Sequence, residues 1–278
     1  MLFDTHLHLI YKDRLSYPWL DDFDALNHDN RFDTYMRDAA RLGITDCLHM
    51  EVDVVEADID ADTELVRALM APPGRLMRGA ISSCRPELDD FPALLERARE
   101  GGIVKGFRRV LHVVPDEVSQ SATFRDNVKR LSGTGLTFDL CILPRQLGLA
   151  AELADHCPDV RFVLDHCGVP DVASGALDPW RADMRALAKR QNVVAKISGV
   201  VAYGDAETWS LRDIRPFVEE TVAAFGHDRV VWGSDLPVCN LGGGLSTWVA
   251  ATHALTDGWS ADDRAALYHQ NARRLWTL

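Results

Sequence analysis

The sequence predicts a single (β/α)8 barrel, and three observations support this prediction. Strand-like apolar runs alternate with helix-like segments along the 278 residues, eight such runs can be counted, and polar side chains follow the ends of most of them. Alternation of this kind indicates parallel strands joined by crossover helices. Barrels commonly reach this length as one domain, so we expect one domain spanning residues 1–278.

The strand-like runs are short and rich in Val, Ile, Leu and Phe. They span residues 3–9, 44–50, 76–81, 103–110, 136–142, 160–164, 193–197 and 230–233. Between them, apolar residues recur at three- and four-residue spacing, which is typical of helices that bury one face. The clearest helical segments span residues 34–42, 56–70, 88–100, 145–156 and 216–225. The stretch from residue 11 to residue 31 has no period, and we expect a loop over the barrel mouth there.

An open, doubly wound sheet is the alternative that alternation allows. Such a sheet would carry a Gly-rich turn after its first strand, whereas here the first run contains His6-Leu7-His8. In a TIM-type barrel the carboxyl ends of all strands converge on one mouth. The polar residues that we expect there are His6, His8, Glu51, Arg108, Arg109, Asp139, His166, Lys196 and Asp235. The sequence therefore favours a closed barrel with its active site at the C-terminal ends of the strands.

The charge balance disfavours some classes of partner. A formal net charge of −12 is unsuited to nucleic acid or to an anionic membrane surface. The first residues do not read as an export signal, and the apolar stretches are too short to cross a bilayer. The six cysteines are scattered without a C-x-x-C pair, which indicates core residues instead of a disulfide framework. We therefore expect a cytoplasmic protein acting on a small molecule, and the sequence leaves its oligomeric state open.

His6 and His8 are two residues apart on the first predicted strand, so we expect their side chains on the same face. Two imidazoles at this separation can share one divalent ion, and zinc is the commonest metal for nitrogen and carboxylate ligands. An H-x-H pair also occurs by chance as two ordinary polar side chains. The pair alone is weak evidence for a metal.

Asp235 stands at the end of the last predicted strand, which neighbours the first strand once the barrel closes. A carboxylate there can bind a metal, accept a proton from water, or do both in sequence. The alternative is an Asp that caps the next turn through backbone N–H groups. Its position at the mouth favours the chemical role, so we predict Asp235 as catalytic base and metal ligand.

Two further residues extend the candidate site. His166 stands at the end of the sixth predicted strand and can serve as a metal ligand or as a donor that polarises a carbonyl oxygen. Glu51 follows the second run and can complete the coordination shell of a metal. Glu51 can equally begin a solvated acidic loop, and both readings stay open.

Six motifs occur in a fixed order along nearly the whole chain. They are residues 4–8 (DTHLH), 16–20 (SYPWL), 105–111 (KGFRRVL), 162–168 (FVLDHCG), 196–199 (KISG) and 233–239 (GSDLPVC). No single motif is specific, but their order and spacing together are. In this respect the chain resembles the amidohydrolase superfamily, and within it the amidohydrolase-related branch that hydrolyses lactones.

The resemblance implies a barrel in which two first-strand histidines, a sixth-strand histidine and an eighth-strand aspartate act on a hydrolytic water. Those positions are occupied here by His6, His8, His166 and Asp235. The implied reaction is hydrolysis of a lactone, most naturally a sugar acid lactone of the L-fuconolactone or L-rhamnonolactone type. Asp235 would activate the water, and His166, an inward Arg and any metal would stabilise the oxyanion.

The chain departs from the superfamily members that bind two metals. Its fifth run offers Asp139 but no histidine at its end, and Lys105 lies too early on the fourth run to reach the mouth as a carboxylated bridging lysine. We therefore expect at most one divalent ion, with zinc as the first candidate. The resemblance also allows a mechanism without metal.

Four residues are candidates for binding the substrate. Arg108 and Arg109 end the fourth run, where one should face inward and bind substrate oxygens while the other faces outward. Trp19 and Tyr203 lie in segments that follow strand ends and can form a wall for a polyol. Aromatic residues in loops serve just as often in packing, so this assignment carries little weight.

Two other functions fit the same residues. A metal-dependent decarboxylase of the same superfamily would use a similar array of His and Asp, and release of carbon dioxide would reveal it. A non-catalytic barrel would bind a sugar or a metal tightly without forming a product. Three histidines and an aspartate converging near a water are costly to assemble for binding alone, so catalysis is the favoured interpretation.

Overall fold

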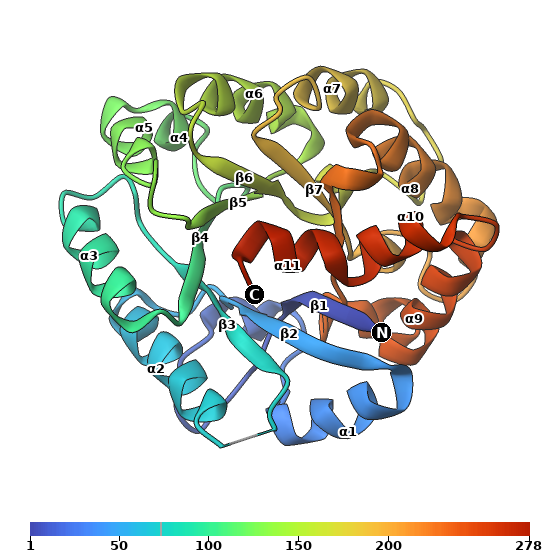
Figure 1. Ribbon diagram of the computed structural model, residues 1–278, viewed down its shortest axis with the longest axis horizontal. Coiled ribbons are helices and arrows are strands. Elements are labelled where there is room, and N and C mark those ends of the chain that lie inside the picture. The colour runs from blue at the N-terminus through green and yellow to red at the C-terminus, as the bar shows by residue number, and fades with distance from the viewer. Residues whose placement is uncertain (73) are drawn as a thin grey trace.

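The computed structural model describes residues 1–72 and 74–278, and its strands form one parallel sheet. Each strand pairs with the next in chain order, from β1 to β8. The strands are β1 (Leu2–Leu7), β2 (Ile44–Met50), β3 (Met77–Ser83), β4 (Val104–Val110), β5 (Thr137–Cys141), β6 (Arg161–Leu164), β7 (Val193–Ile197) and β8 (Val230–Trp232). Figure 1 shows them in a ring with helices on the outside. The predicted (β/α)8 barrel is thereby confirmed.

Backbone contacts just beyond β8 close the ring onto β1. The amide of Asp235 donates to the carbonyl of His6 at 2.8 Å, and the amide of His8 donates to the carbonyl of Leu236 at 2.9 Å. Leu7 and Leu236 form an isolated parallel bridge between these bonds. The segment that carries Asp235 therefore lies directly beside the two histidines, as closure of the barrel requires.

The helices lie between successive strands and after the last one. They are α1 (Phe32–Leu42), α2 (Ile59–Met70), α3 (Phe91–Gly101), α4 (Glu117–Gln120), α5 (Ala122–Lys129), α6 (Leu147–His156), α7 (Trp180–Leu187), α8 (Leu211–Phe225), α9 (Gly244–Leu255), α10 (Ala261–Ala265) and α11 (Asn271–Trp276). The five predicted helical segments correspond to α1, α2, α3, α6 and α8. The sequence patterns missed α4, α5, α7, α10 and α11, which have eight residues or fewer, and α9, whose mostly small and apolar residues give little periodicity.

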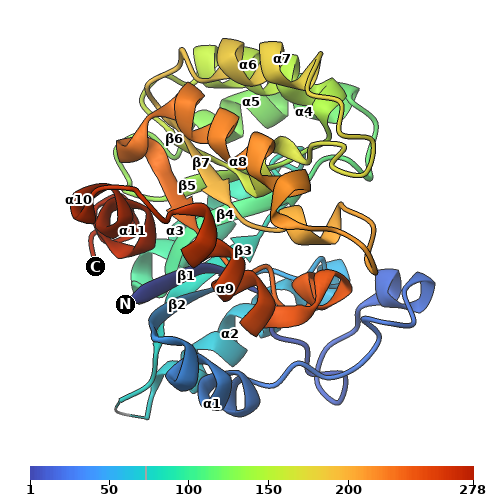
Figure 2. The same cartoon turned by 90° about the vertical axis from the view of Figure 1, so that its right-hand side faces the viewer.

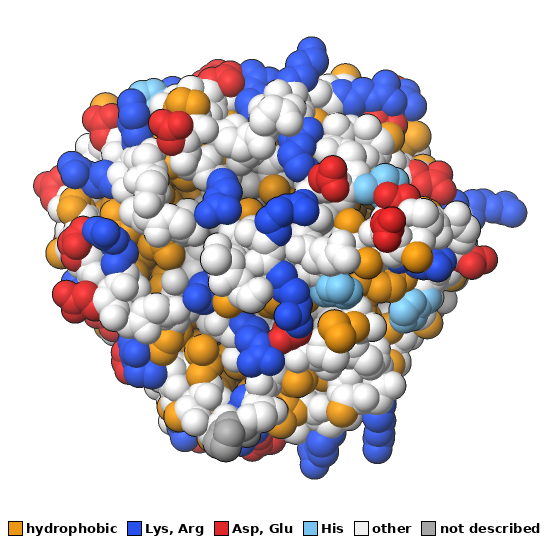
Figure 3. Space-filling model, in the orientation of Figure 1, with side chains coloured by type: hydrophobic (Ala, Val, Ile, Leu, Met, Phe, Trp, Pro, Cys, Tyr) orange, Lys and Arg blue, Asp and Glu red, His pale blue; other side chains and the backbone are white. Residues whose placement is uncertain are grey.

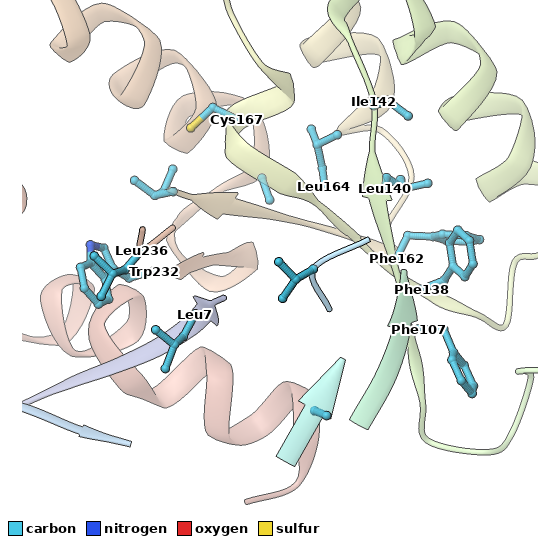
Figure 4. Close-up of a cluster of buried hydrophobic side chains, with 14 of the residues drawn as sticks. Leu7, Phe107, Phe138, Leu140, Ile142, Phe162, Leu164, Cys167, Trp232 and Leu236 are labelled. Atoms are coloured by element: carbon cyan, nitrogen blue, oxygen red, sulfur yellow. The ribbon is translucent and has the colours of Figure 1, made fainter. Parts of the chain in front are cut away.

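The main apolar layer lies between the strands and the helices. Side chains such as Phe138, Phe162, Leu164 and Trp232 point away from the barrel axis and are buried (Figure 4). Phe138 and Phe162 meet edge to face across β5 and β6, with ring centres 6.1 Å apart. Since side chains alternate along a strand, the neighbours of these residues face the barrel interior.

A second, smaller apolar cluster fills the N-terminal end of the barrel. It combines strand residues with the end of the chain: Phe3, Leu48, Met50, Ile81, Val163, Val231, Ala272, Leu275 and Trp276. The indole of Trp276 donates to Thr137 Oγ1 at 3.1 Å, and α11 lies across this opening (Figure 1). The interior is therefore packed at one end, which leaves the C-terminal ends of the strands for the polar residues.

The segment from residue 11 to residue 31 lies on the side away from the chain termini, as predicted for a loop at the mouth (Figure 2). It contains a 3-10 turn, Pro18–Asp22, and is tied to the loop after β2. Ser16 N donates to Asp58 at 2.8 Å, and Trp19 Nε1 donates to the carbonyl of Val52 at 2.8 Å. The two loops therefore support each other.

The face opposite the barrel mouth carries both termini and has a local excess of basic side chains. Lys and Arg side chains gather over its centre, while Asp and Glu lie mostly toward its rim (Figure 3).

All six cysteines are buried and unpaired in the part of the chain that is described, which confirms them as core residues. Within residues 1–72 and 74–278, the helices are too short or too polar to cross a membrane.

Candidate active site

His6 and His8 meet at the carboxyl end of β1, although β1 ends at Leu7 and its register with β2 is irregular between Asp4 and Leu7. Their Nε2 atoms lie 3.1 Å apart. Nδ1 of His8 lies 2.9 Å from the carbonyl oxygen of Glu51, which only accepts hydrogen bonds. His8 therefore carries its proton on Nδ1 and presents the lone pair of Nε2 to the site.

Asp235 lies three residues beyond β8, in a left-handed conformation with φ 56°, and not at the strand end as the sequence indicated. Its Oδ1 is 3.4 Å from His8 Nε2 and 3.7 Å from His6 Nε2, and its Oδ2 is 3.7 Å from His166 Nδ1. Neither carboxylate oxygen has a hydrogen-bond partner among the residues that the structure describes. A buried carboxylate without donors indicates a group kept for a ligand or for a reaction.

His166 was expected at the end of the sixth strand, but β6 ends at Leu164. His166 and Cys167 adopt φ values of 53° and 54°, and this left-handed turn directs the imidazole back over the barrel. Nδ1 of His166 lies 2.9 Å from Ser198 Oγ. Because a strand pattern cannot encode positive φ at non-glycine residues, the sequence placed His166 correctly at the mouth but missed the turn that aims it.

Gly199 lets these two turns approach each other. It has φ +70°, and a Cβ there would lie 2.7 Å from His166 Nδ1 and 2.8 Å from Asp235 Oδ2. Gly233 has a similar role beside β1, since its Cβ would lie 2.7 Å from the Cβ of His6. The absence of a side chain at both positions allows the histidines and Asp235 to come together.

Asp4, to which the sequence analysis gave no role, fixes the position of the site residues through three hydrogen bonds. Its Oδ1 accepts from the amides of His6 at 3.1 Å and Ser234 at 2.7 Å, and its Oδ2 accepts from the Tyr35 hydroxyl at 2.8 Å. One buried carboxylate thus joins β1, α1 and the segment after β8. This connection fixes the position of His6 relative to Asp235.

A buried ionic cluster lies under His6. The ammonium of Lys196 is 2.7 Å from Asp139 Oδ2, 2.9 Å from Asp165 Oδ1 and 3.1 Å from His6 Nδ1. Nδ1 of His6 is also 3.3 Å from Asp165 Oδ1. The sequence placed Lys196 and Asp139 at the mouth without a role and did not single out Asp165. The alternation of side chains along β5 and β7 could have indicated that Asp139 and Lys196 face the barrel interior.

Arg108 is the inward member of the arginine pair. Its Nε donates to Glu51 Oε1 at 2.6 Å, its Nη2 donates to the carbonyl of Glu51 at 2.8 Å, and its Nη1 lies 3.4 Å from His6 Nε2. The second oxygen of Glu51 accepts from the amide of Asp53 at 2.7 Å. Glu51 therefore orients Arg108 and lies outside the groups that can hold a metal, so we do not carry its assignment as a ligand forward.

Arg109 faces away from this cluster. Its guanidinium pairs with Glu87 at 2.8 Å, in the segment between β3 and α3. Of the predicted aromatic wall, Tyr203 lies near the site, with its ring centre 6.3 Å from that of His166. Trp19 instead packs against Phe23 and bonds to Val52, so its role in binding a substrate stays a prediction.

Burial controls the protonation of the site. It raises the pKa of Asp235 to about 6 and lowers the pKa of His8 to about 3. Burial, helped by the charge of Lys196, holds the pKa of His6 well below its usual range, and burial lowers the pKa of His166 as well. At neutral pH the three imidazoles are therefore uncharged and the carboxylate of Asp235 is ionised.

The ionic cluster behaves differently. Burial raises the pKa of Asp139 to about 7, against the opposing charge of Lys196. Burial also opposes ionisation of Asp165, but the charge of Lys196 and the contact with His6 outweigh it and hold the pKa of Asp165 well below its usual range. The two carboxylates in turn outweigh burial and raise the pKa of Lys196. Lys196 and Asp165 thus form the charged core of the cluster.

Among the residues that the structure describes, two groups of side chains have the geometry to hold a metal ion: His6, His8 and Asp235, and His6, Asp165 and His166. The first group offers two imidazole nitrogens and a carboxylate, the donor set that suits zinc. Its unpartnered Asp235 oxygens and the lone pair of His8 Nε2 fit a cation at this point. In the second group, the ammonium of Lys196 already lies within 3.1 Å of His6 and Asp165.

Access to the site is narrow. His6 and Asp235 are 0% and 1% exposed, while His8 and His166 keep 7% and 6%. A ligand arriving from the mouth would therefore meet His8 and His166 first. Tyr203, which is only partly buried, borders the same approach.

Comparisons with known proteins agree with the motif resemblance. A family model described as amidohydrolase matches residues 3–278. An L-fucono-1,5-lactonase of Burkholderia multivorans is 33% identical over 210 residues, which are 67% of this chain and 68% of the relative. Another L-fucono-1,5-lactonase, from Burkholderia ambifaria, is 29% identical over 194 residues, or 68% of this chain and 67% of the relative.

A solved amidohydrolase structure is similar to this chain over the full length of the chain. The crystal structure of an amidohydrolase from Burkholderia multivorans with bound zinc is 26% identical and has a TM-score of 0.89, covering 100% of this chain and 99% of that one. The closed barrel of this chain agrees with this match. The chain belongs to the amidohydrolase family.

Proposed function

We propose that this protein hydrolyses a lactone, and that the substrate is a sugar acid lactone of the L-fuconolactone or L-rhamnonolactone type. The observation that carries the proposal is the buried carboxylate of Asp235, whose free oxygens face His6, His8 and His166 at the barrel mouth. The two lactonases to which the chain is similar support the substrate class.

In the proposed reaction, Asp235 accepts a proton from a water that attacks the carbonyl carbon of the ring ester. A pKa of about 6 leaves this carboxylate ionised at neutral pH and basic enough to accept that proton. The carbon–oxygen bond of the ring then breaks, and the proton held by Asp235 passes to the departing ring oxygen. The product is an open-chain hydroxy acid.

Two other residues serve the oxyanion that forms during the attack. When the Ser198 hydroxyl donates to Nδ1 of His166, the proton of the neutral imidazole lies on Nε2, where it can donate to the carbonyl oxygen. Arg108, fixed by Glu51, adds a positive charge beside His6. We propose these roles for His166 and Arg108 and none for Arg109.

A divalent ion fits the group of His6, His8 and Asp235, and we propose zinc as the first candidate. When bound, such an ion would polarise the carbonyl group or lower the pKa of water. The residue roles above do not depend on it. A cytoplasmic location also stays a prediction.

The test is acid release from a panel of aldonolactones and pyrone lactones, followed with a pH indicator, on protein whose metal content has been measured. We expect at least one sugar acid lactone to be opened faster than in buffer. A panel without turnover, with or without added zinc, would contradict the proposal. Release of carbon dioxide from an aromatic or enol acid would then identify a decarboxylase, and tight binding without product would identify a binding protein.

A further inference from the structure

Each of the three N–H groups of the Lys196 ammonium has one acceptor within hydrogen-bond distance. An ammonium has three N–H donors and no acceptor. The three acceptors around it are Asp139 Oδ2 at 2.7 Å, Asp165 Oδ1 at 2.9 Å and His6 Nδ1 at 3.1 Å. All four side chains are 0–1% exposed, so water does not offer an easy substitute for any of these partners. The third N–H of Lys196 is therefore directed at Nδ1 of His6.

This contact determines where His6 carries its proton. A nitrogen that accepts from Lys196 must present a lone pair, so the proton of the neutral imidazole lies on Nε2. Nε2 of His6 is 3.1 Å from Nε2 of His8, whose lone pair is free because Nδ1 of His8 donates to the Glu51 carbonyl. Arg108 Nη1, which can only donate, lies farther from Nε2 of His6, at 3.4 Å, so the shorter contacts with Lys196 and His8, both 3.1 Å, decide the tautomer. Lys196, His6, His8 and the Glu51 carbonyl are thus joined by matched donors and acceptors.

A metal ion held by His6, His8 and Asp235 needs the other tautomer. His6 would have to present the lone pair of Nε2 and carry its proton on Nδ1. The acceptor for that proton is Asp165 Oδ1, 3.3 Å away, which would complete a carboxylate–histidine–metal arrangement. Lys196 and Asp165 therefore act on the same nitrogen in opposite directions.

We propose that Lys196 is a positioning residue that holds His6 in the tautomer unable to bind metal, and so weakens the affinity of the site for zinc. On zinc binding, Nε2 of His6 would release its proton to solvent and Nδ1 would take one up from solvent, so the imidazole stays neutral. The Nδ1–H group would then donate a hydrogen bond to Asp165 Oδ1, and Lys196 would keep both of its carboxylate partners. This inference rests on the metal site included in the proposed function.

A charge-matched variant isolates the hydrogen bond from the charge. Lys196→Met alone would remove a positive charge, and that removal would by itself favour cation binding. It would also leave the buried carboxylates of Asp139 and Asp165 without their Lys196 partner. At pH 8, above the pKa of about 7 of Asp139, the double variant Lys196→Met/Asp139→Asn removes one charge of each sign and still deletes the donor to His6. Arg190→Met/Asp155→Asn, which breaks an ion pair of 2.6 Å between α6 and the segment after α7, is the matched control.

The first readout is the tautomer of His6. Histidine labelled with 15N distinguishes the two ring nitrogens in long-range NMR correlations, and His6→Asn identifies the His6 signals among the ten histidines. In chelator-treated wild-type protein we expect the proton on Nε2, and after zinc addition on Nδ1. In the double variant we expect it on Nδ1 before zinc is added.

The second readout is the dissociation constant of zinc, measured by competition with a fluorescent chelator. We expect the double variant to bind zinc about tenfold more tightly than the wild type, the scale of effect of residues that orient a metal ligand. The control pair should leave the constant unchanged. A wild-type His6 already protonated on Nδ1 without zinc, or equal zinc affinity in the double variant, would overturn the inference.

Neither readout uses a substrate. A protein that opens no lactone but shows the expected tautomers would contradict the proposed function and leave this inference intact. A lactonase whose His6 carries its proton on Nδ1 in all states would do the reverse.

Discussion

At the scale of single residues, the site depends on groups that are costly to bury. The carboxylate of Asp235 is 1% exposed and has no hydrogen-bond donor within the described residues. Burial of an unsatisfied charge lowers the stability of the fold, so the presence of the Asp235 carboxylate at this position indicates a functional role. Lys196 is the opposite case, because its charge is matched by Asp139 and Asp165.

Asp235→Asn should stabilise the protein without metal, and more so at high pH. Burial raises the pKa of Asp235 from 3.8 to about 6, so its contribution to stability is complete below pH 3.8 and lost as the pH rises through 6. At pH 8 the variant should gain on the order of 2 kcal/mol over the wild type. Thermal unfolding with a chelator at pH 5 and pH 8 measures this. A gain that does not grow with pH would contradict it.

Lys196→Met should destabilise the barrel more than Lys196→Met/Asp139→Asn does. The single variant leaves a buried carboxylate uncompensated, which typically costs about 3–5 kcal/mol, and the second substitution removes one such charge. Denaturant unfolding of both variants and of Asp139→Asn gives the coupling energy between the two residues. If the double variant is less stable than the single one, the ionic pairing is not what holds this cluster together.

At the scale of elements, the site is built by turns that follow the strands. The carboxyl ends of β6 and β8 are each continued by a left-handed residue, His166 and Asp235, and Gly199 after β7 leaves room for both. These conformations cost energy and persist because the surrounding structure holds them. The chemistry of the mouth is thus set by three short turns on a rigid barrel.

Gly199→Ala should reduce kcat/KM by at least tenfold. The new Cβ would lie 2.7 Å from His166 Nδ1 and 2.8 Å from Asp235 Oδ2, so both side chains must move. Gly43→Ala is the matched control, because Gly43 is also left-handed, with φ +73°, but no described atom lies within 4 Å of its Cβ position. Kinetics on the preferred lactone compare the two. Equal losses in both variants would point to backbone strain alone.

The sequence predicted the elements better than the turns. The runs at 44–50 and 193–197 match β2 and β7 residue for residue, because buried parallel strands are continuous apolar segments with clear ends. His6, His8, His166 and Asp235 were placed at the mouth because each lies at the carboxyl end of such a run. The pairing of Glu51 with Arg108 was not predicted, because the two residues are distant in sequence. Asp165 was missed because a motif residue next to a histidine shows nothing of its contact with Lys196.

At the scale of the whole molecule, the barrel separates stability from chemistry. The N-terminal end is filled by apolar side chains, and α11 covers it (Figure 2). The polar cluster around His6 lies toward the carboxyl ends of the strands. Substitutions at the covered end should therefore change stability and leave activity intact.

Trp276→Ala tests this separation. The indole is 4% exposed, packs inside the barrel and donates to Thr137 Oγ1. Its removal should lower the free energy of unfolding by about 3–5 kcal/mol. Below the unfolding temperature, kcat/KM should stay within twofold of the wild type. Urea unfolding and lactone kinetics measure the two quantities, and a large loss of kcat/KM in the folded variant would show that the two ends are coupled.

The central claim is that Asp235 accepts the proton of the attacking water. The most direct measurement is kcat/KM of wild type and Asp235→Asn on the best lactone of the panel, from pH 5 to pH 8, with folding of the variant checked by circular dichroism. We predict a wild-type rate that falls tenfold per pH unit below about pH 6 and a folded variant with at least a hundredfold lower rate. A folded Asp235→Asn protein with near wild-type activity would contradict the account.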